Sequence, residues 1–226
     1  RKIKGHDFSA LLGVTAEHWE RKYESLSGSG YTNDNLTYKN LLGLVHPDNF
    51  TSSSYVQYQE KLSALGRFNY NYRRRYYLTV TLRGDGASNF AENRKWGFFP
   101  AAAVRWSIMN EKWFEKASWL NDLSIRLSAG RSGNDAISPY MSLASFTSSY
   151  SSWIFGDDKQ LAYTASKLAN SNLTWETTDS YNLGFSFAGW GNRVVLEADA
   201  YVSNTKDLLL SMRNTQTTGY NTYYAN

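Results

Sequence analysis

The sequence predicts an all-β protein, and more narrowly a segment of an antiparallel β-barrel that crosses a membrane. Apolar and polar residues alternate with a period of two in six stretches and, less regularly, in a seventh, whereas helical periodicity is nearly absent. Connections between these stretches alternate in length, as in bacterial outer-membrane barrels. Aromatic residues make up 16% of the chain, and no apolar run approaches the roughly 20 residues of a transmembrane helix.

The seven predicted strands follow one another along the chain. The first, at residues 6–20, is the least regular, with an apolar face of Phe8, Ala10, Leu12 and Val14. The clearest alternation lies at 62–72 and 76–83, which only Arg73-Arg74-Arg75 separates, so these two strands are expected to form a hairpin. The remaining strands are predicted at about 96–108, 122–132, 174–188 and 193–209.

The predicted connections differ in length according to the end of the sheet at which they lie. At one end they are long or of medium length, at about 21–60, 84–95 and 133–173, and at the other they are shorter, at 73–75, 109–121 and 189–192. A soluble β-sandwich gives no reason for this segregation, and connections of roughly 40 residues are unusual there. We therefore expect 21–60 and 133–173 to be extracellular loops and the short turns to be periplasmic.

The strand length and the positions of several aromatic residues also suit a bilayer. Ten residue steps separate Trp96 from Trp106, or roughly 33 Å of strand, which covers about 23 Å of the bilayer normal at a tilt near 45°. The apolar band of such barrels is about 25 Å tall and is flanked by aromatic girdles. We predict that Tyr72, Tyr76, Trp96 and Trp106 are membrane-interface aromatics; the alternative is that they are core residues of a soluble sheet.

Seven strands are too few for a large barrel, and an odd number is unusual for a bacterial single-chain barrel. An open sheet in hydrocarbon would leave unpaired backbone groups at a cost of several kcal/mol each. No signal peptide opens the chain. We therefore expect residues 1–226 to be an internal part of a larger barrel domain.

Charged residues in the polar register are the candidate residues of the barrel interior. Four consecutive strands each place one arginine there, and the last strand adds two carboxylates: Arg67, Arg83, Arg105, Arg126, Glu197 and Asp199. A charge that faces lipid at mid-membrane costs about 2–4 kcal/mol, so these side chains should face the lumen. They would contact carboxylates of a plug or line a transport path; the alternative is that they only solvate the wall or pair with one another.

The sequence gives little support for catalysis, metal binding or nucleic-acid binding. The chain has no cysteine and only three histidines, without metal-ligand spacing. No nucleophile or phosphate-loop motif is present, and the net charge of +4 is spread without a basic stripe. We expect no catalytic residue, no metal or other cofactor, and no nucleic-acid partner.

Motifs over residues 65–100 and beyond resemble the SusC/RagA family of TonB-dependent outer-membrane transporters. The resemblance rests on Leu65-Gly66-Arg67-Phe68-Asn69-Tyr70-Asn71-Tyr72, Arg83-x-Asp85-Gly86-x-Ser88-x-Phe90, Trp96-Gly97-Phe98-Phe99-Pro100, Ser128-x-Gly130-x-x-Gly133-Asn134, Asn172-Leu173-x-Trp175-Glu176-Thr177-Thr178 and Asp207-Leu208-Leu209. It covers essentially the whole chain. The departures are mild: Arg74 stands where an acidic residue is common, and Gly84 replaces a polar one.

This resemblance implies an energised importer with a plugged barrel of about 22 strands. The plug and the closing strands would lie outside this chain. TonB would act on the plug, a SusD-like lipoprotein would cap the outer side, and the cargo would be glycans or, less often, peptides. In the long loops, aromatic residues could stack on sugars or pack against the lipoprotein, or merely stabilise their loop: Tyr140, Tyr150, Trp153, Phe155 and Tyr163. The alternatives are a passive porin and a soluble β-rich carbohydrate-binding module.

Overall fold

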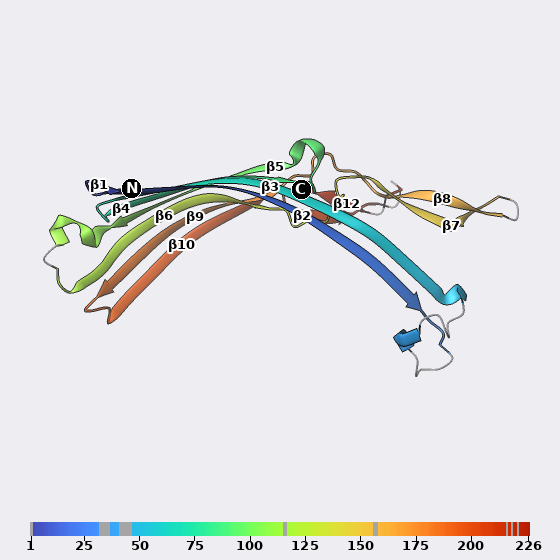
Figure 1. Cartoon of the computed structure of the whole chain (residues 1–226), viewed down its shortest axis with the longest axis horizontal. Helices are drawn as coiled ribbons and strands as arrows, with labels where there is room; N and C mark the ends of the chain where they lie inside the picture. The colour runs from blue at the N-terminus through green and yellow to red at the C-terminus, as the bar shows by residue number, and fades with distance from the viewer. Residues whose placement is uncertain are drawn as a thin grey trace. The chain divides into compact units, whose positions relative to one another are not determined.

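A computed structural model describes residues 2–31, 37–40, 47–114, 117–155, 158–215, 217, 219–220 and 222–226. The chain divides into two compact units, one of Arg1–Glu17 with Lys61–Asn226 and the other of His18–Glu60. Strands dominate both units, and among the described residues helices are limited to short 3-10 turns (Figure 1). No helix in those ranges has the length and apolar character needed to cross a membrane.

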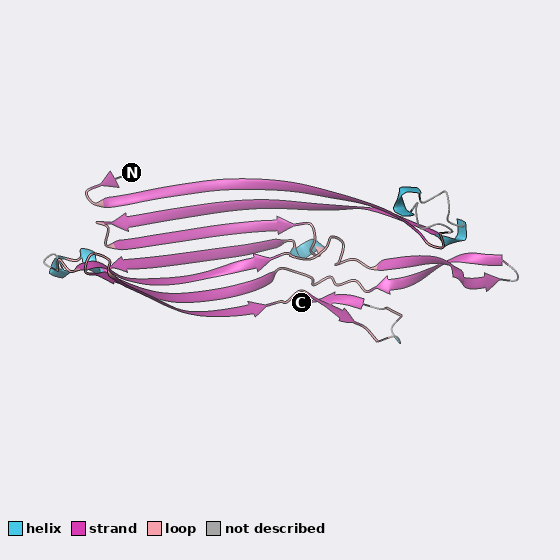
Figure 2. Ribbon diagram, turned by 90° about the horizontal axis from the view of Figure 1, so that it is seen from below, coloured by secondary structure: helices cyan, strands magenta, loops and turns pink. Residues whose placement is uncertain are grey.

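The larger unit is built on an antiparallel sheet in which successive strands lie side by side (Figure 2). Within the described residues its order is β1-β2-β3-β4-β5-β6-β9-β10. The strands are β1 (Lys2–Ile3), β2 (His6–Gly28), β3 (Phe50–Tyr72), β4 (Tyr76–Ala87), β5 (Trp96–Ser107), β6 (Leu120–Asn134), β9 (Glu176–Gly189) and β10 (Val194–Lys206). All seven predicted strands are present, and the all-β antiparallel prediction is confirmed.

Two of the expected long loops contain more strand than the sequence indicated. Strands β2 and β3 continue to Gly28 and from Phe50, so the connection expected at 21–60 is confined to 29–49. The segment 133–173 holds β7 (Ser145–Phe155) and β8 (Asp158–Lys167), which join β11 (Leu210–Arg213) and β12 (Thr222–Ala225) in a second sheet. Serine and threonine occupy both registers of β7, so it shows no apolar stripe to mark it as a strand.

The smaller unit contains the distal parts of β2 and β3. The rings of Tyr23 and Tyr55 stack with centroids 4.8 Å apart, and His18 Nδ1 lies 3.4 Å from the Glu60 carboxylate. Two 3-10 turns, η1 (Thr37–Asn40) and η2 (Pro47–Asn49), lie between the two strands.

The short hairpin that the sequence predicts between β3 and β4 closes through three residues, Arg73 to Arg75, and Arg73 and Arg74 are the central residues of its β-turn. The Arg75 N–H donates to the Tyr72 carbonyl at 2.9 Å, and Arg73 and Arg74 have φ angles of 51° and 58°. Positive φ at both central residues is the mark of a type I′ turn, whose backbone twist matches that of the flanking strands. This turn requires a left-handed conformation that arginine adopts at a cost.

Antiparallel pairing that runs through the sheet from β3 to β10 divides the side chains into two faces. Arg105 pairs with Tyr77 and Arg126, while Trp106 pairs with Tyr76 and Ile125. Directly paired residues project to the same side of a sheet, so the arginine row and the tryptophan row lie on opposite faces. We call them the polar face and the apolar face; the apolar face includes Phe68, Leu78, Val104, Leu127, Leu183 and Val202.

Side chains of the apolar face are largely exposed. Leu127, Leu183 and Val202 retain 55%, 52% and 69% of their surface. A soluble sandwich would cover such a stripe with a second sheet, because large exposed apolar patches are rare on soluble proteins. The described core instead lies at one end of the strands, where Phe90 and Phe99 pack on Trp175 with centroids 5.0 and 5.3 Å apart.

Candidate functional site

The polar face carries the six charged residues that the sequence placed in one register. Cross-strand pairing puts all of them on the same side of the sheet: Arg67, Arg83, Arg105, Arg126, Glu197 and Asp199. Three of the four arginines meet a carboxylate there. Arg83 lies 2.8 Å from Asp85, Arg105 3.4 Å from Asp122, and Arg126 3.5 Å from Asp199.

The Arg83–Asp85 pair is the most enclosed of the three. Arg83 Nε lies 2.8 Å from both carboxylate oxygens, and a terminal nitrogen donates to Ser63 Oγ at 3.2 Å. Asp85 and Ser63 are 8% and 7% exposed. Charge-assisted contacts at this distance stabilise a partly buried carboxylate better than water-exposed pairs do, so this part of the wall is fixed.

The Arg126–Asp199 pair crosses an intervening strand. Arg126 lies on β6 and Asp199 on β10, while both residues pair with Gly184 on β9. A Cβ at Gly184 would lie 2.6 Å from Asp199 Oδ1 and 2.8 Å from Arg126 Nε. The pair therefore requires a residue without a side chain at position 184, and the sequence alone did not reveal this requirement.

Arg67 differs from the other three arginines. Its Nε donates to Thr81 Oγ1 at 3.2 Å, and among the described residues no carboxylate lies in ion-pair range of it. β3 has a strand on each side, so both neighbouring positions of the wall are already occupied. Arg67 thus presents an uncompensated positive charge on the polar face.

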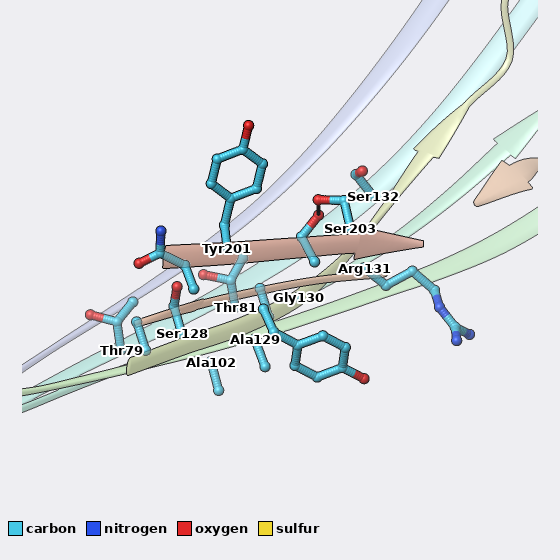
Figure 3. A pocket seen from close by; sticks show the side chains of 15 residues that line it. Thr79, Thr81, Ala102, Ser128, Ala129, Gly130, Arg131, Ser132, Tyr201 and Ser203 are labelled. Carbon is cyan, nitrogen blue, oxygen red and sulfur yellow. Dashed lines mark hydrogen bonds between the residues drawn. The ribbon is translucent and has the colours of Figure 1, made fainter. Parts of the chain in front are cut away.

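Between the charged rows lies a depression lined by small and hydroxyl side chains. Its volume is about 550 Å³, and its polar-face lining consists of Thr79, Thr81, Ala101, Ala103, Ser128, Gly130, Ser132, Ser180, Asn182, Tyr201 and Ser203. Figure 3 shows Ser128, Tyr201 and Ser203 on one side of the ribbons and Ala102 and Arg131 on the other. Apart from Tyr201 on β10, the side chains that line the depression are short, so another surface can approach the sheet backbone closely.

Of the five predicted loop aromatics, the structure describes the side chains of Tyr140 and Tyr163. Tyr140, in the connection before β7, is 45% exposed and has a φ of 65°. Tyr163 on β8 is 70% exposed. Tyr150, Trp153 and Phe155 belong to β7, but their side chains lie outside the described residues. Their part in substrate or partner contact stays a prediction.

Lys167 is a buried cation that no sequence pattern singles out. Its Nζ donates to the Tyr140 carbonyl at 2.7 Å and lies 3.6 Å from Met141 Sδ, and the residue is 8% exposed. Burial lowers the pKa of Lys167 because the charged form loses its hydration. This hydrogen bond joins β8 to the backbone of Tyr140 in the connection before β7.

The predicted interface aromatics lie on the apolar face, at two ends of the strands. At the short-turn end, the Tyr76 ring lies 6.5 Å from both Tyr72 and Trp106. Glu111 accepts hydrogen bonds there from Tyr76 Oη at 2.7 Å and from Trp106 Nε1 at 3.1 Å. Trp96 lies at the opposite end and is 64% exposed.

The described part of the chain shows no metal-binding site. No group of three or more His, Cys, Asp or Glu side chains is placed there to hold an ion. The polar face instead offers ion pairs, hydroxyl groups and the uncompensated Arg67, which suit contact with another polar surface.

Comparison with known proteins gives consistent matches over the whole length. The family model described as TonB dependent receptor-like, beta-barrel matches residues 3–226. TonB-dependent receptor P3 of Formosa agariphila is 34% identical over 92% of this chain, and TonB-dependent receptor SusC of Bacteroides thetaiotaomicron is 30% identical over 98%. The chain spans 20% and 22% of those two proteins.

Solved structures agree with these matches. A chain of the RagAB peptide transporter superposes with a TM-score of 0.84 and 26% identity, over 99% of this chain and 24% of that one. The siderophore receptor PirA of Pseudomonas aeruginosa, at 17% identity and a TM-score of 0.52, shares the fold. The SusC and RagAB matches confirm the resemblance seen in the sequence motifs.

Proposed function

This chain belongs to the TonB-dependent receptor β-barrel family, and from that premise we propose that it is a wall segment of an energised outer-membrane importer. The family is one of receptors rather than of enzymes. The division into two faces carries the proposal. Along the middle of the strands one face is apolar and exposed, as hydrocarbon contact requires, and the other holds charged pairs, as a wet interior requires. The ion pair that the apolar face does carry, Arg131 with Asp179, lies near the end of β6 and the start of β9, at the edge of that face.

In this proposal the two ends of the strands face different compartments. The connections at 29–49 and 135–175 are extracellular, and the turns at 73–75, 108–119 and 190–193 are periplasmic. Support comes from the shortness of the latter group, as in outer-membrane barrels generally. Tyr72, Tyr76 and Trp106 then lie at the periplasmic interface and Trp96 at the outer one.

We further propose that the whole protein imports nutrient oligomers with a SusD-like lipoprotein on its outer side and TonB on its periplasmic side. Glycans, the first expectation, follow from the resemblance of the sequence motifs to the SusC/RagA family, and the RagAB peptide transporter supports peptides as the second. In this scheme a plug inside the barrel couples transport to TonB, while the wall formed by this chain bounds the path of the substrate.

Within the wall, the paired arginines and Arg67 have different proposed roles. Arg83, Arg105 and Arg126 are compensated by Asp85, Asp122 and Asp199, so they shape the interior without needing a further partner. Arg67 is proposed to meet a carboxylate of the plug. Glu197 lies on β10 and is expected to meet a cation from the next barrel strand or from the lumen.

Uptake by the full-length protein tests the proposal. Cells that express it are given labelled oligosaccharides or oligopeptides, with and without TonB. Import that requires TonB supports the proposal, whereas equal import without TonB identifies a passive porin instead.

The wall charge can be tested in the same cells. Arg67→Gln should admit a bulky antibiotic that the closed transporter excludes, because the plug loses a contact, whereas Arg105→Gln serves as the matched control. Equal antibiotic sensitivity of the two variants would contradict the role of Arg67.

A further inference from the structure

The short-turn end of the sheet carries a concentration of cations that the proposed transport path does not use. Four exposed side chains form what we call the basic edge: Lys4, Arg73, Arg74 and Lys112. None of the four forms an ion pair among the described residues, whereas neighbouring Arg75 is neutralised by Glu111 at 3.3 Å. These four cations therefore lack a carboxylate partner within the described part of the chain.

Arg73 is directed to the apolar face. Its guanidinium carbon lies 5.2 Å from the centroid of the Tyr72 ring, and Tyr72 belongs to the apolar face through its pairing with Tyr76. The Arg73 N–H also donates to the Gly5 carbonyl at 2.7 Å, which ties the turn to the β1–β2 connection. The charge thus lies where the apolar face ends, and not over the lumen.

A groove in the apolar face begins next to this turn. It has a volume of about 440 Å³, comparable with one fatty acyl chain, and its apolar-face lining is Tyr70, Tyr76, Leu78, Val104, Trp106, Ile125 and Leu127. Tyr76 begins β4 directly after the arginine turn, so cationic and apolar surfaces are continuous. Such an arrangement matches an amphiphile with an anionic head and an apolar tail.

The conformation of the turn indicates that Arg73 and Arg74 are not there because they favour the turn. Type I′ turns favour Asn-Gly at their two central positions because both residues have positive φ. Here Arg73 and Arg74 occupy them at 51° and 58°, a conformation that disfavours long L side chains. Strain that a better turn sequence would relieve points to a use for the two guanidinium groups.

We propose that this end of the sheet binds one anionic glycerophospholipid of the periplasmic leaflet, with its phosphate on Arg73 and Arg74 and an acyl chain in the groove. Guanidinium groups bind phosphate in a bidentate manner, and Lys4 and Lys112 add to the attraction. The inference rests on the proposed membrane orientation and adds a lipid partner to it.

Lipid binding by the full-length protein tests this inference. The protein is placed in phosphatidylcholine nanodiscs that contain phosphatidylglycerol, and retained phosphatidylglycerol is measured by native mass spectrometry. The double variant Arg73→Asn with Arg74→Gly keeps a favourable turn and loses both charges. We expect its affinity for the tightest-bound phosphatidylglycerol to fall roughly tenfold to thirtyfold.

The matched control removes two cations from the opposite end of the strands. Arg94→Gln with Lys95→Gln should leave phosphatidylglycerol binding unchanged, since both exposed side chains follow β4 at its other end. Equal retention by the turn variant and the wild type, or equal loss in the control, would overturn the inference. Val104→Phe adds a second arm: it should weaken phosphatidylglycerol binding by filling the groove, and unchanged binding would exclude the acyl-chain part.

TonB-dependent uptake by the same variants separates this inference from the proposed function. Uptake should persist in the turn variant, because Arg73 lies over the apolar face and both arginines lie in the turn, beyond the paired strands. A wild-type protein that imports substrate but retains no phosphatidylglycerol refutes the lipid site alone. One that retains the lipid but imports nothing refutes the transport proposal alone.

Discussion

Gly184 allows two charged side chains on strands that are not neighbours to meet. The sequence placed Arg126 and Asp199 in one register, because period-two alternation fixes the side of the sheet, and the structure brings them to 3.5 Å. The same pattern could not identify which carboxylate each arginine meets, since that depends on cross-strand register. Asp122 as the partner of Arg105, and Gly184 as the gap between Arg126 and Asp199, were therefore not predicted.

Gly184→Val should separate Arg126 from Asp199. The added side chain would occupy the space where both charged groups now lie, and forced overpacking costs roughly 1–3 kcal/mol. We expect a lower urea midpoint for the full-length barrel in detergent micelles. Gly191→Ala, at a turn position with nothing within 4 Å of an added Cβ, is the steric control, although its φ of 67° adds backbone strain. A midpoint for Gly184→Val equal to or above the wild type would show that the pair is dispensable.

Glu111 should make stability depend on pH. The hydrogen bond from Tyr76 lowers the pKa of Glu111 below its ordinary value of 4.5, burial opposes this, and Trp106 and Arg75 lower it further. A depressed folded-state pKa contributes stability above the unfolded pKa, and that contribution is lost as the pH falls through the folded value. The Glu111→Gln variant should thus be less stable than the wild type at neutral pH. Its free energy of unfolding should also change less between pH 7 and acid pH, as urea titrations at each pH would measure. An unchanged slope would rule out Glu111 as the source.

Among the elements, β4, β5 and β6 follow the sequence prediction closely. Each has one apolar and one polar register, so its boundaries differ from the expected ones by only a few residues. β7 and β8 were not predicted, because hydroxyl side chains occur in both registers of β7 and give no apolar stripe. These two strands are stabilised by pairing with each other, which an alternation pattern does not reveal. The outer ends of β2 and β3 were missed for a related reason: they are rich in charged and hydroxyl residues on both sides.

The β3–β4 turn gives a prediction about element stability. Replacing Arg73 with Asn and Arg74 with Gly should raise the free energy of unfolding by about 1 kcal/mol, because both residues relieve strain at positive φ. Urea unfolding of the full-length protein in detergent, without added phospholipid, measures it. A destabilised variant would mean that the contacts of Arg73 with Tyr72 and Gly5 outweigh the strain.

At the scale of the whole molecule, we expect a charged substitution to be destabilising on the apolar face of the sheet and to be tolerated on the polar face. Leu127→Lys puts an ammonium group on the apolar face and should destabilise membrane insertion by about 2–4 kcal/mol at mid-bilayer depth. Ser128→Lys, the next residue, lies on the polar face and should have little effect. Folding of the full-length protein into phosphatidylcholine vesicles compares them. Equal effects of the two substitutions would mean that the faces are not lipid and lumen.

The pairing of β5 with β6 is staggered: Ser107, the last residue of β5, pairs with Ser124, whereas β6 begins at Leu120. Such displacement of a strand along its neighbour is the shear that accompanies strand slant in a closed barrel. A plane parallel to the bilayer then cuts the ladder obliquely, so residues at equal depth are not those joined by hydrogen bonds. Val104, Leu127 and Leu183 form one continuous row across three strands. Tryptophan placed at each position in turn should be quenched by brominated lipids at three successive depths.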